Sequence, residues 1–124
     1  MSKAIPIISI VDDDKGAREA FATFVRSLGY SASMFGSAEE FLKSEKLHNT
    51  SCLITDLQMP GLSGLDLQDR LIAGGRRIPV IFITGQPNDI ARARAMKAGA
   101  VAFLSKPHDV HHFVGCIEQA LQAA

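Results

Sequence analysis

The sequence predicts an α/β protein built on a doubly wound, five-stranded parallel sheet with helices on both faces. Short apolar runs rich in Val and Ile recur along the chain, and a stretch with helical periodicity follows each of them. Most of these runs lack polar–apolar alternation, so both of their faces should be buried. Strands that alternate with helices in this way pair in parallel through right-handed crossovers.

Four of the five expected strands are apolar and end at a polar residue. They are residues 7–11, which lead into Asp12; 52–55, into Asp56; 80–83, into Thr84; and 101–105, into Lys106. Residues 31–35 form a shorter, more polar second strand. In parallel sheets of this kind, ligands bind beyond the carboxyl ends of the strands. The four polar side chains should therefore gather at one edge of the sheet.

The expected helices show apolar residues at three- and four-residue steps. These are Ala17, Phe21, Phe24, Val25 and Leu28 in the first helix; Phe41, Leu42 and Leu47 in the second; Leu65, Leu67, Leu71 and Ile72 in the third; and Val110, Phe113, Val114, Ile117 and Leu121 in the last. The fourth is an alanine-rich helix that begins at Asn88 or Asp89.

Residues typical of helix ends support these assignments. Ser37 and Glu40 have capping-box spacing, and glycines end three helices at Gly29, Gly74-Gly75 and Gly99. The last helix should begin near Asp109. The resulting (βα)5 order is that of a flavodoxin-like fold.

Composition limits the function. The chain has 124 residues, 47% of them hydrophobic, which fits a single domain over residues 1–124. Its 13 basic and 13 acidic residues cancel, so charge alone should draw it neither to DNA nor to a membrane. The two unclustered cysteines, Cys52 and Cys116, suggest reduced thiols and a cytoplasmic location. Gly-rich nucleotide loops are absent, which argues against ATP as a direct substrate.

Three carboxylates are expected at the functional edge. Asp12, Asp13 and Asp56 would meet there if the first and third strands are neighbours. Such a cluster is self-repulsive, and Mg²⁺ with its preference for oxygen ligands would relieve the repulsion. Acidic residues also cap helices, and we expect Asp14 to do so. Asp56 ends a different strand and needs no capping role, so helix capping explains the cluster less well.

Lys106 and Thr84 complete the predicted site. Either residue alone would be an unremarkable surface lysine or strand threonine. Opposite the carboxylates, however, Lys106 could pair with an anionic phosphoryl group, and the Thr84 hydroxyl could donate to one of its oxygens. The five residues together indicate a phosphoryl-acceptor site with an aspartate as nucleophile.

At these residues the sequence resembles the receiver domain of bacterial two-component response regulators. The resemblance covers nearly the whole chain and is carried by Val11-Asp12-Asp13, Asp56-Leu57-Gln58-Met59-Pro60-Gly61, Ile83-Thr84-Gly85, Lys97-Ala98-Gly99-Ala100 and Lys106-Pro107. Residues 37–42 and 63–68 are similar to the FixJ-like branch, whose members usually carry a DNA-binding domain after the receiver.

The resemblance implies a role for each site residue. Asp56 would accept a phosphoryl group from a phosphohistidine of a sensor histidine kinase. Asp13 and Asp56 would bind Mg²⁺ directly, Asp12 would bind it through water, and the backbone carbonyl of Gln58 would be a further ligand.

The resemblance also implies a conformational switch. Thr84 and Lys106 would bind the phosphoryl group, and Phe103 would turn inward as Thr84 moves. The output surface would be the fourth helix, fifth strand and fifth helix, through which the phosphorylated domain would form a homodimer. DNA would be bound only by an output domain absent from this chain. Residues 1–124 would then be either a stand-alone regulator or, as the FixJ-like branch favours, the receiver of a longer transcription factor.

The favoured interpretation is thus a signalling switch that catalyses its own phosphorylation and slow dephosphorylation, rather than a conventional enzyme. One alternative is a Mg²⁺-dependent phosphohydrolase with Asp12 as nucleophile and Asp14 as general acid. Another is a receiver that binds partners without being phosphorylated.

A separate hypothesis concerns the last helix. His108, His112 and Cys116 are spaced at four-residue steps, expected opposite the apolar stripe. Such a set could ligate zinc, although a solvated helix face explains it better.

Overall fold

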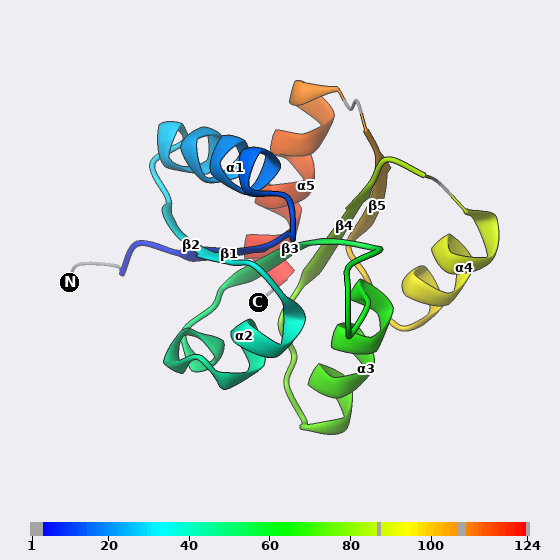
Figure 1. The fold of residues 1–124 in the computed structure, drawn as a ribbon. Helices are drawn as coiled ribbons and strands as arrows, with labels where there is room; N and C mark the ends of the chain where they lie inside the picture. The colour runs from blue at the N-terminus through cyan, green and yellow to red at the C-terminus, as the bar shows by residue number, and fades with distance from the viewer. Residues whose placement is uncertain (1–3, 87, 107–108, 124) are drawn as a thin grey trace.

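The computed structural model describes residues 4–86, 88–106 and 109–123, and it confirms the predicted doubly wound sheet (Figure 1). The strands are β1 (Ile7–Val11), β2 (Ser31–Phe35), β3 (Cys52–Asp56), β4 (Val80–Thr84) and β5 (Ala102–Ser105). All pairings are parallel, and the strand order is β2-β1-β3-β4-β5. This is the flavodoxin-like order, in which β1 and β3 are neighbours.

Helices cover both faces of the sheet. They are α1 (Lys15–Ser27), α2 (Ala38–Lys43), α3 (Gly64–Ala73), α4 (Asp89–Lys97) and α5 (Val110–Ala123), with a 3₁₀ helix η1 (Glu45–His48) after α2. In Figure 1, α1 and α5 lie on one face and α2, α3 and α4 on the other. Among the described helices, none combines the length and apolar character needed to cross a bilayer.

Each face has its own core, because successive strand residues point to opposite sides. Ile8, Ile10, Ile54 and Ile81 belong to the core under α1 and α5, where Phe113 stacks on Phe24 with ring centroids 5.5 Å apart. On the other face the core holds Val11, Leu53, Phe82 and Phe103 from the strands and Phe41, Leu67, Leu71, Ala91 and Ala95 from the helices.

The helices begin at the polar residues that the sequence suggests. Asp14 caps α1, as predicted, by accepting from the Ala17 N–H, and Asn88 caps α4. Ser37 accepts from the Glu40 N–H, but the Glu40 carboxylate accepts from Gly36 rather than from Ser37, so only half of the expected capping box forms.

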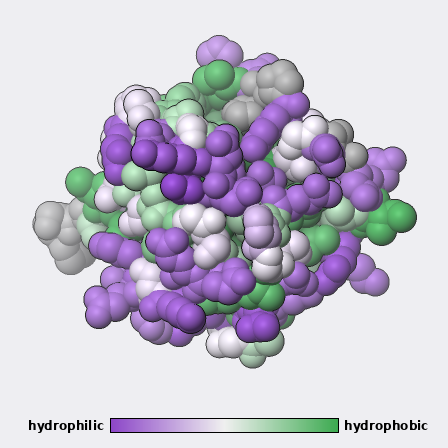
Figure 2. Space-filling model, viewed as in Figure 1, coloured by the Kyte–Doolittle hydropathy of each residue, from purple (hydrophilic) through white to green (hydrophobic). Residues whose placement is uncertain are grey.

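The apolar pattern of the helices differs from the prediction at three positions, although Leu47 still packs against the core. Leu47 lies in η1 rather than α2, because the chain leaves α2 at Ser44, whose side chain caps η1. Ile72 and Val110 are 51% and 54% exposed. Ile72 lies in the last turn of α3 and Val110 is the first residue of α5, so both stand at a helix end. In the view of Figure 2 the surface is mostly hydrophilic, with apolar residues in separate patches.

The favoured solvated face of the last helix is wrong at Cys116, and the less favoured zinc arrangement fails with it. Cys116 is only 5% exposed and packs in the core with Phe113 and Ile117, whereas His112 is exposed. The buried stripe of α5 therefore includes the small residue at position 116, and the histidine and the cysteine do not share a solvated face. His108 lies outside the described residues.

Candidate functional site

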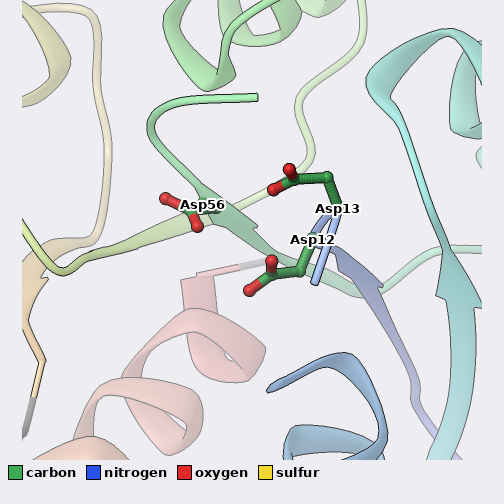
Figure 3. A group of neighbouring side chains, drawn as sticks. All are labelled: Asp12, Asp13 and Asp56. Atoms are coloured by element: carbon green, nitrogen blue, oxygen red, sulfur yellow. The ribbon is translucent and has the colours of Figure 1, made fainter. Parts of the chain in front are cut away.

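The carboxyl ends of β1 and β3 bring the three predicted aspartates together. The register pairs Val11 with Thr55, so the next residue on each strand is Asp12 or Asp56. Figure 3 shows the side chains of Asp12, Asp13 and Asp56 projecting into the same space. One carboxylate oxygen from each residue lies within 4.8 Å of the others. The expected acidic cluster is thus present.

Asp12 is the innermost of the three, with 2% of its surface exposed. Its Oδ1 accepts from the Asp14 N–H at 2.9 Å, and its Oδ2 lies 3.5 Å from Lys106 Nζ. Burial raises the pKa of the Asp12 carboxyl above its ordinary value, and the Asp14 N–H and the Lys106 charge only partly offset this. A charge held here is therefore costly, and the surrounding donors lower that cost.

Asp56 is nearer to solvent, with 15% of its side chain exposed. Its Oδ2 lies 3.4 Å from Lys106 Nζ, and its Oδ1 accepts from the Gln58 N–H at 3.3 Å. The carboxylate is held by these two donors and remains accessible. Of the two carboxylates that contact Lys106, that of Asp56 is the more exposed.

Lys106 connects the two carboxylates. Its ammonium contacts Asp12 at 3.5 Å and Asp56 at 3.4 Å, and 29% of its side chain is exposed. The Lys106 N–H donates to the Thr84 carbonyl at 2.8 Å, which fixes the end of β5 against β4. The sequence prediction that Lys106 faces the carboxylates is borne out in position; Pro107, which follows it, lies outside the described residues.

Thr84 ends β4 at the same edge and is 2% exposed. Its hydroxyl accepts from the Gln86 N–H at 3.1 Å, so it is engaged with its own loop. Phe103 on β5 is 9% exposed and packs on Phe82 at a centroid distance of 6.0 Å. The predicted switch residues therefore lie on adjacent strands, with the aromatic ring already buried.

The oxygens of this cluster suit a hard divalent cation. Three carboxylates converge, and the repulsion between Asp12 and Asp56 is among the causes that raise the Asp12 pKa. A cation with oxygen ligands would remove that repulsion. The backbone carbonyl of Gln58, one of the predicted ligands, belongs to the loop that leaves Asp56.

Two residues support the site without having been singled out for it in the sequence. Arg18 Nη1 donates to the Asp12 carbonyl at 2.8 Å, tying α1 to the end of β1. At Gly64, an added Cβ would overlap the Asp56 carbonyl oxygen. The arginine had no recognisable signal, whereas a glycine at a helix start could have suggested a close backbone approach.

The strand order and the acidic edge define the class: a doubly wound α/β domain of flavodoxin-like topology with an anionic site at the carboxyl ends of its strands. A family model described as "Response regulator receiver domain" matches residues 8–118. The chain belongs to this family.

Individual relatives agree with the family assignment. Response regulator protein TodT of Pseudomonas putida is 42% identical over 124 residues, which are all of this chain and 55% of TodT. Transcriptional regulatory protein FixJ of Azorhizobium caulinodans is 35% identical, with 98% of this chain and 57% of FixJ aligned. The crystal structure of FixJ-N superposes with a TM-score of 0.88 at 35% identity, covering 98% of both chains. This chain spans about half the length of those two curated relatives.

Proposed function

We propose that Asp56 accepts a phosphoryl group from a phosphohistidine on a sensor histidine kinase, and that the modified domain controls transcription. The observation that carries this proposal is the ammonium of Lys106, placed 3.5 Å from Asp12 and 3.4 Å from Asp56. A cation in this position can pair with an added phosphoryl group while keeping its contact with the buried carboxylate.

In the transfer, a carboxylate oxygen of Asp56 would attack phosphorus, and the bond from phosphorus to the histidine nitrogen would break. The electron pair of that bond returns to the imidazole ring, and an aspartyl phosphate results. Asp13 and Asp56 would hold Mg²⁺ directly, with the Gln58 carbonyl as a further ligand and Asp12 acting through water. When bound, Mg²⁺ would neutralise charge on the phosphoryl group during its transfer. The same site would catalyse slow hydrolysis of the aspartyl phosphate.

The proposed switch depends on Thr84. Its hydroxyl must release the Gln86 N–H before it can donate to a phosphoryl oxygen. Phosphorylation would favour the conformation in which Thr84 and Lys106 both reach the added oxygens. Phe103 on the next strand would turn further inward as Thr84 moves, from a position where it is already only 9% exposed. Moving a population from 1:99 to 99:1 requires about 5.5 kcal/mol of differential binding, a magnitude that two charge-assisted contacts can approach.

The output would lie outside this chain. We propose that residues 1–124 form a receiver that is followed in the whole protein by a DNA-binding domain, as the length of the relatives allows. The phosphorylated receiver would form a homodimer through α4, β5 and α5, and DNA would be bound only by the output domain. We expect the protein to act in the cytoplasm, as response regulators typically do.

The phosphohydrolase alternative gains no support from the described residues. Its proposed general acid, Asp14, uses its carboxylate to cap α1. Its proposed nucleophile, Asp12, is the most buried of the three aspartates. The third interpretation, a receiver that is never phosphorylated, predicts that no phosphoryl adduct forms.

The test is intact-mass measurement after incubation with acetyl phosphate and Mg²⁺, with Asp56→Asn and Asp12→Asn treated in parallel. We expect one added phosphoryl group that requires Mg²⁺, is lost in alkali and is absent from Asp56→Asn. An adduct that survives Asp56→Asn but disappears in Asp12→Asn would support the phosphohydrolase. If no adduct forms, and beryllium fluoride also fails to bind, the receiver is not phosphorylated.

A further inference from the structure

The loop between β3 and α3, residues 57–63, leaves directly from Asp56 and carries Gln58. Its far end is fixed, because the Gly64 N–H donates to the Leu57 carbonyl at 2.8 Å. Ser63 and Asp66 also form a complete capping box at the start of α3. In the middle of the loop, Met59 and Leu62 pack against the core under α2, α3 and α4, and a polar contact from α2 adds to this packing.

That contact comes from Glu39, in the first turn of α2. Its Oε2 accepts from the Leu62 N–H at 3.4 Å, across 23 positions of sequence. Gly61 has φ +78°, and a Cβ built there would overlap the same carboxylate oxygen. The Glu39 carboxylate therefore lies directly against the backbone of Gly61 and Leu62, in a space that only glycine leaves open.

Glu39 is an unusual residue for simple packing. Its second oxygen, Oε1, is buried and has no hydrogen-bond partner among the described residues, and the ion pairs found in those residues do not include it. Leaving a buried acceptor unsatisfied costs about 1–3 kcal/mol, and an apolar side chain would avoid that cost. The start of α2 favours a carboxylate, yet the adjacent Glu40 also supplies one there. The contact with the loop is the feature that distinguishes Glu39.

We propose that Glu39 is a positioning residue for the phosphoryl-acceptor site. By holding Gly61 and Leu62, it keeps the preceding part of the loop in place, where the Gln58 N–H bonds Asp56 Oδ1 and the Gln58 carbonyl would face the metal. The effect on catalysis rests on the proposed function of Asp56. The geometric part, that Glu39 holds the loop, is independent of it.

The first experiment compares Glu39→Ala with Glu39→Gln, whose amide oxygen can still accept from Leu62. The matched control is Glu40→Ala, which removes an acidic residue from the same helix turn. The native Glu40 carboxylate accepts from the Gly36 N–H and does not contact the loop. Mg²⁺ affinity is measured by titration calorimetry, and the rate of adduct formation with acetyl phosphate is measured as a function of Mg²⁺ concentration.

We expect Glu39→Ala to weaken Mg²⁺ binding about 10-fold, the low end of the range for residues that support metal ligands. Saturating Mg²⁺ should restore most of the rate. Glu39→Gln should stay within about 2-fold of the wild type, because the acceptor is kept, and Glu40→Ala should not differ. A lower melting temperature in Glu39→Ala with unchanged Mg²⁺ affinity would overturn the proposal.

A second variant approaches the same contact from the loop. Gly61→Ala would push the Glu39 carboxylate away and should weaken Mg²⁺ binding as Glu39→Ala does. In the double variant the combined effect should be smaller than the sum, because the contact with Glu39 can be lost only once, whereas the strain of an alanine at φ +78° remains in both backgrounds. Full additivity would contradict the proposal.

Hydrogen exchange at the Leu62 amide separates this inference from the proposed function. Exchange should be faster in Glu39→Ala than in the wild type and in Glu40→Ala. If the wild type forms no Mg²⁺-dependent adduct, the proposed function fails, and faster Leu62 exchange would still support the contact. Unchanged exchange would overturn the positioning role of Glu39 whatever the chemistry.

Discussion

Two parts of β1 and β3 differ in what they bury. The middles of the strands bury apolar side chains, whereas a carboxylate is buried at the carboxyl end of β1. Ile10 and Ile54 pair across the two strands and are almost fully buried in an apolar core. Two residues further along, the same strands deliver Asp12 and Asp56. Asp12 is 2% exposed, close to the 0% of Ile10, yet it carries a carboxylate. The same degree of burial therefore stabilises the fold at Ile10 and costs free energy at Asp12.

This contrast separates stability from function within one pair of strands. Burying an apolar side chain contributes about 1.5–3 kcal/mol, whereas a buried charge is tolerated only when it is paired and hydrogen-bonded. The Asp14 N–H and Lys106 supply that pairing for Asp12. The ends of the strands thus depend on a few polar contacts, and the middles depend on packing.

The largest expected effect on stability is in the middle of the sheet. Ile54→Ala should lower the free energy of unfolding by about 2–5 kcal/mol, because it leaves a cavity in the core under α1 and α5. Urea denaturation followed by circular dichroism measures this. A loss below 1 kcal/mol would mean that the core can collapse around the missing atoms, and the contrast between strand middle and strand end would then weaken.

A smaller loss is expected when the ends of the strands lose their cation. Lys106→Met keeps most of the side-chain volume but leaves Asp12 and Asp56 without a counter-charge. We expect a loss of about 1–3 kcal/mol at pH 7, between the values for exposed and buried ion pairs. The same denaturation series tests it. Lys106→Met should lower the free energy of unfolding less at pH 4 than at pH 7. An equal loss at both pH values would show that the Lys106 ammonium does not act through its charge.

Removing the buried charge of Asp12 should raise the stability of the folded protein, in contrast to the removal of Lys106. The pKa of Asp12 is raised in the folded protein, so between the unfolded and folded pKa values the folded state binds more protons and stability falls as pH rises. Asp12→Asn should therefore be more stable than the wild type at pH 7, with a gain that shrinks as pH falls towards the ordinary pKa of 3.8. Thermal unfolding from pH 3.5 to 7.5 measures the gain. A gain that grows at low pH would contradict the assignment.

The smallest effect concerns the thiol of Cys52, the first residue of β3, which is buried in the core under α1 and α5. Burial, with a lesser contribution from Cys116, raises the pKa of Cys52 to about 12, so almost no thiolate forms at neutral pH. Iodoacetamide should not modify Cys52 in the folded protein at pH 8, and should do so in urea. Mass spectrometry of the labelled peptides is the readout. Rapid labelling without denaturant would show that the strand opens locally.

Much of this arrangement was predictable, because the relevant signals are local. Apolar runs and helical periodicity predicted the strand and helix order, and the parallel sheet then placed the strand ends together. This is why Asp12, Asp13, Asp56 and Lys106 were found from the sequence. Asp14 was assigned to its cap for the same reason, since a cap lies within one turn of the helix that it begins.

The errors came where a residue's role depends on distant neighbours. Leu47 continued the helical spacing of α2, and only the turn at Ser44 separates it from that helix. Cys116 matched a four-residue step on α5, but the core accepts a small side chain there. The contact of Glu39 with Leu62 joins two elements, and no pattern within either segment signals it.

The tight approach of Gly64 to the Asp56 carbonyl has a consequence for how such a domain can vary in length. The beginning of α3 is held against the backbone of the residue proposed to react, so α3 cannot slide to absorb an added or deleted residue in the loop before it. An insertion there would have to bulge outward into solvent, and a deletion would pull on Asp56 itself. Changes in chain length are therefore better accommodated at the opposite edge of the sheet, where the loops lead into the strands.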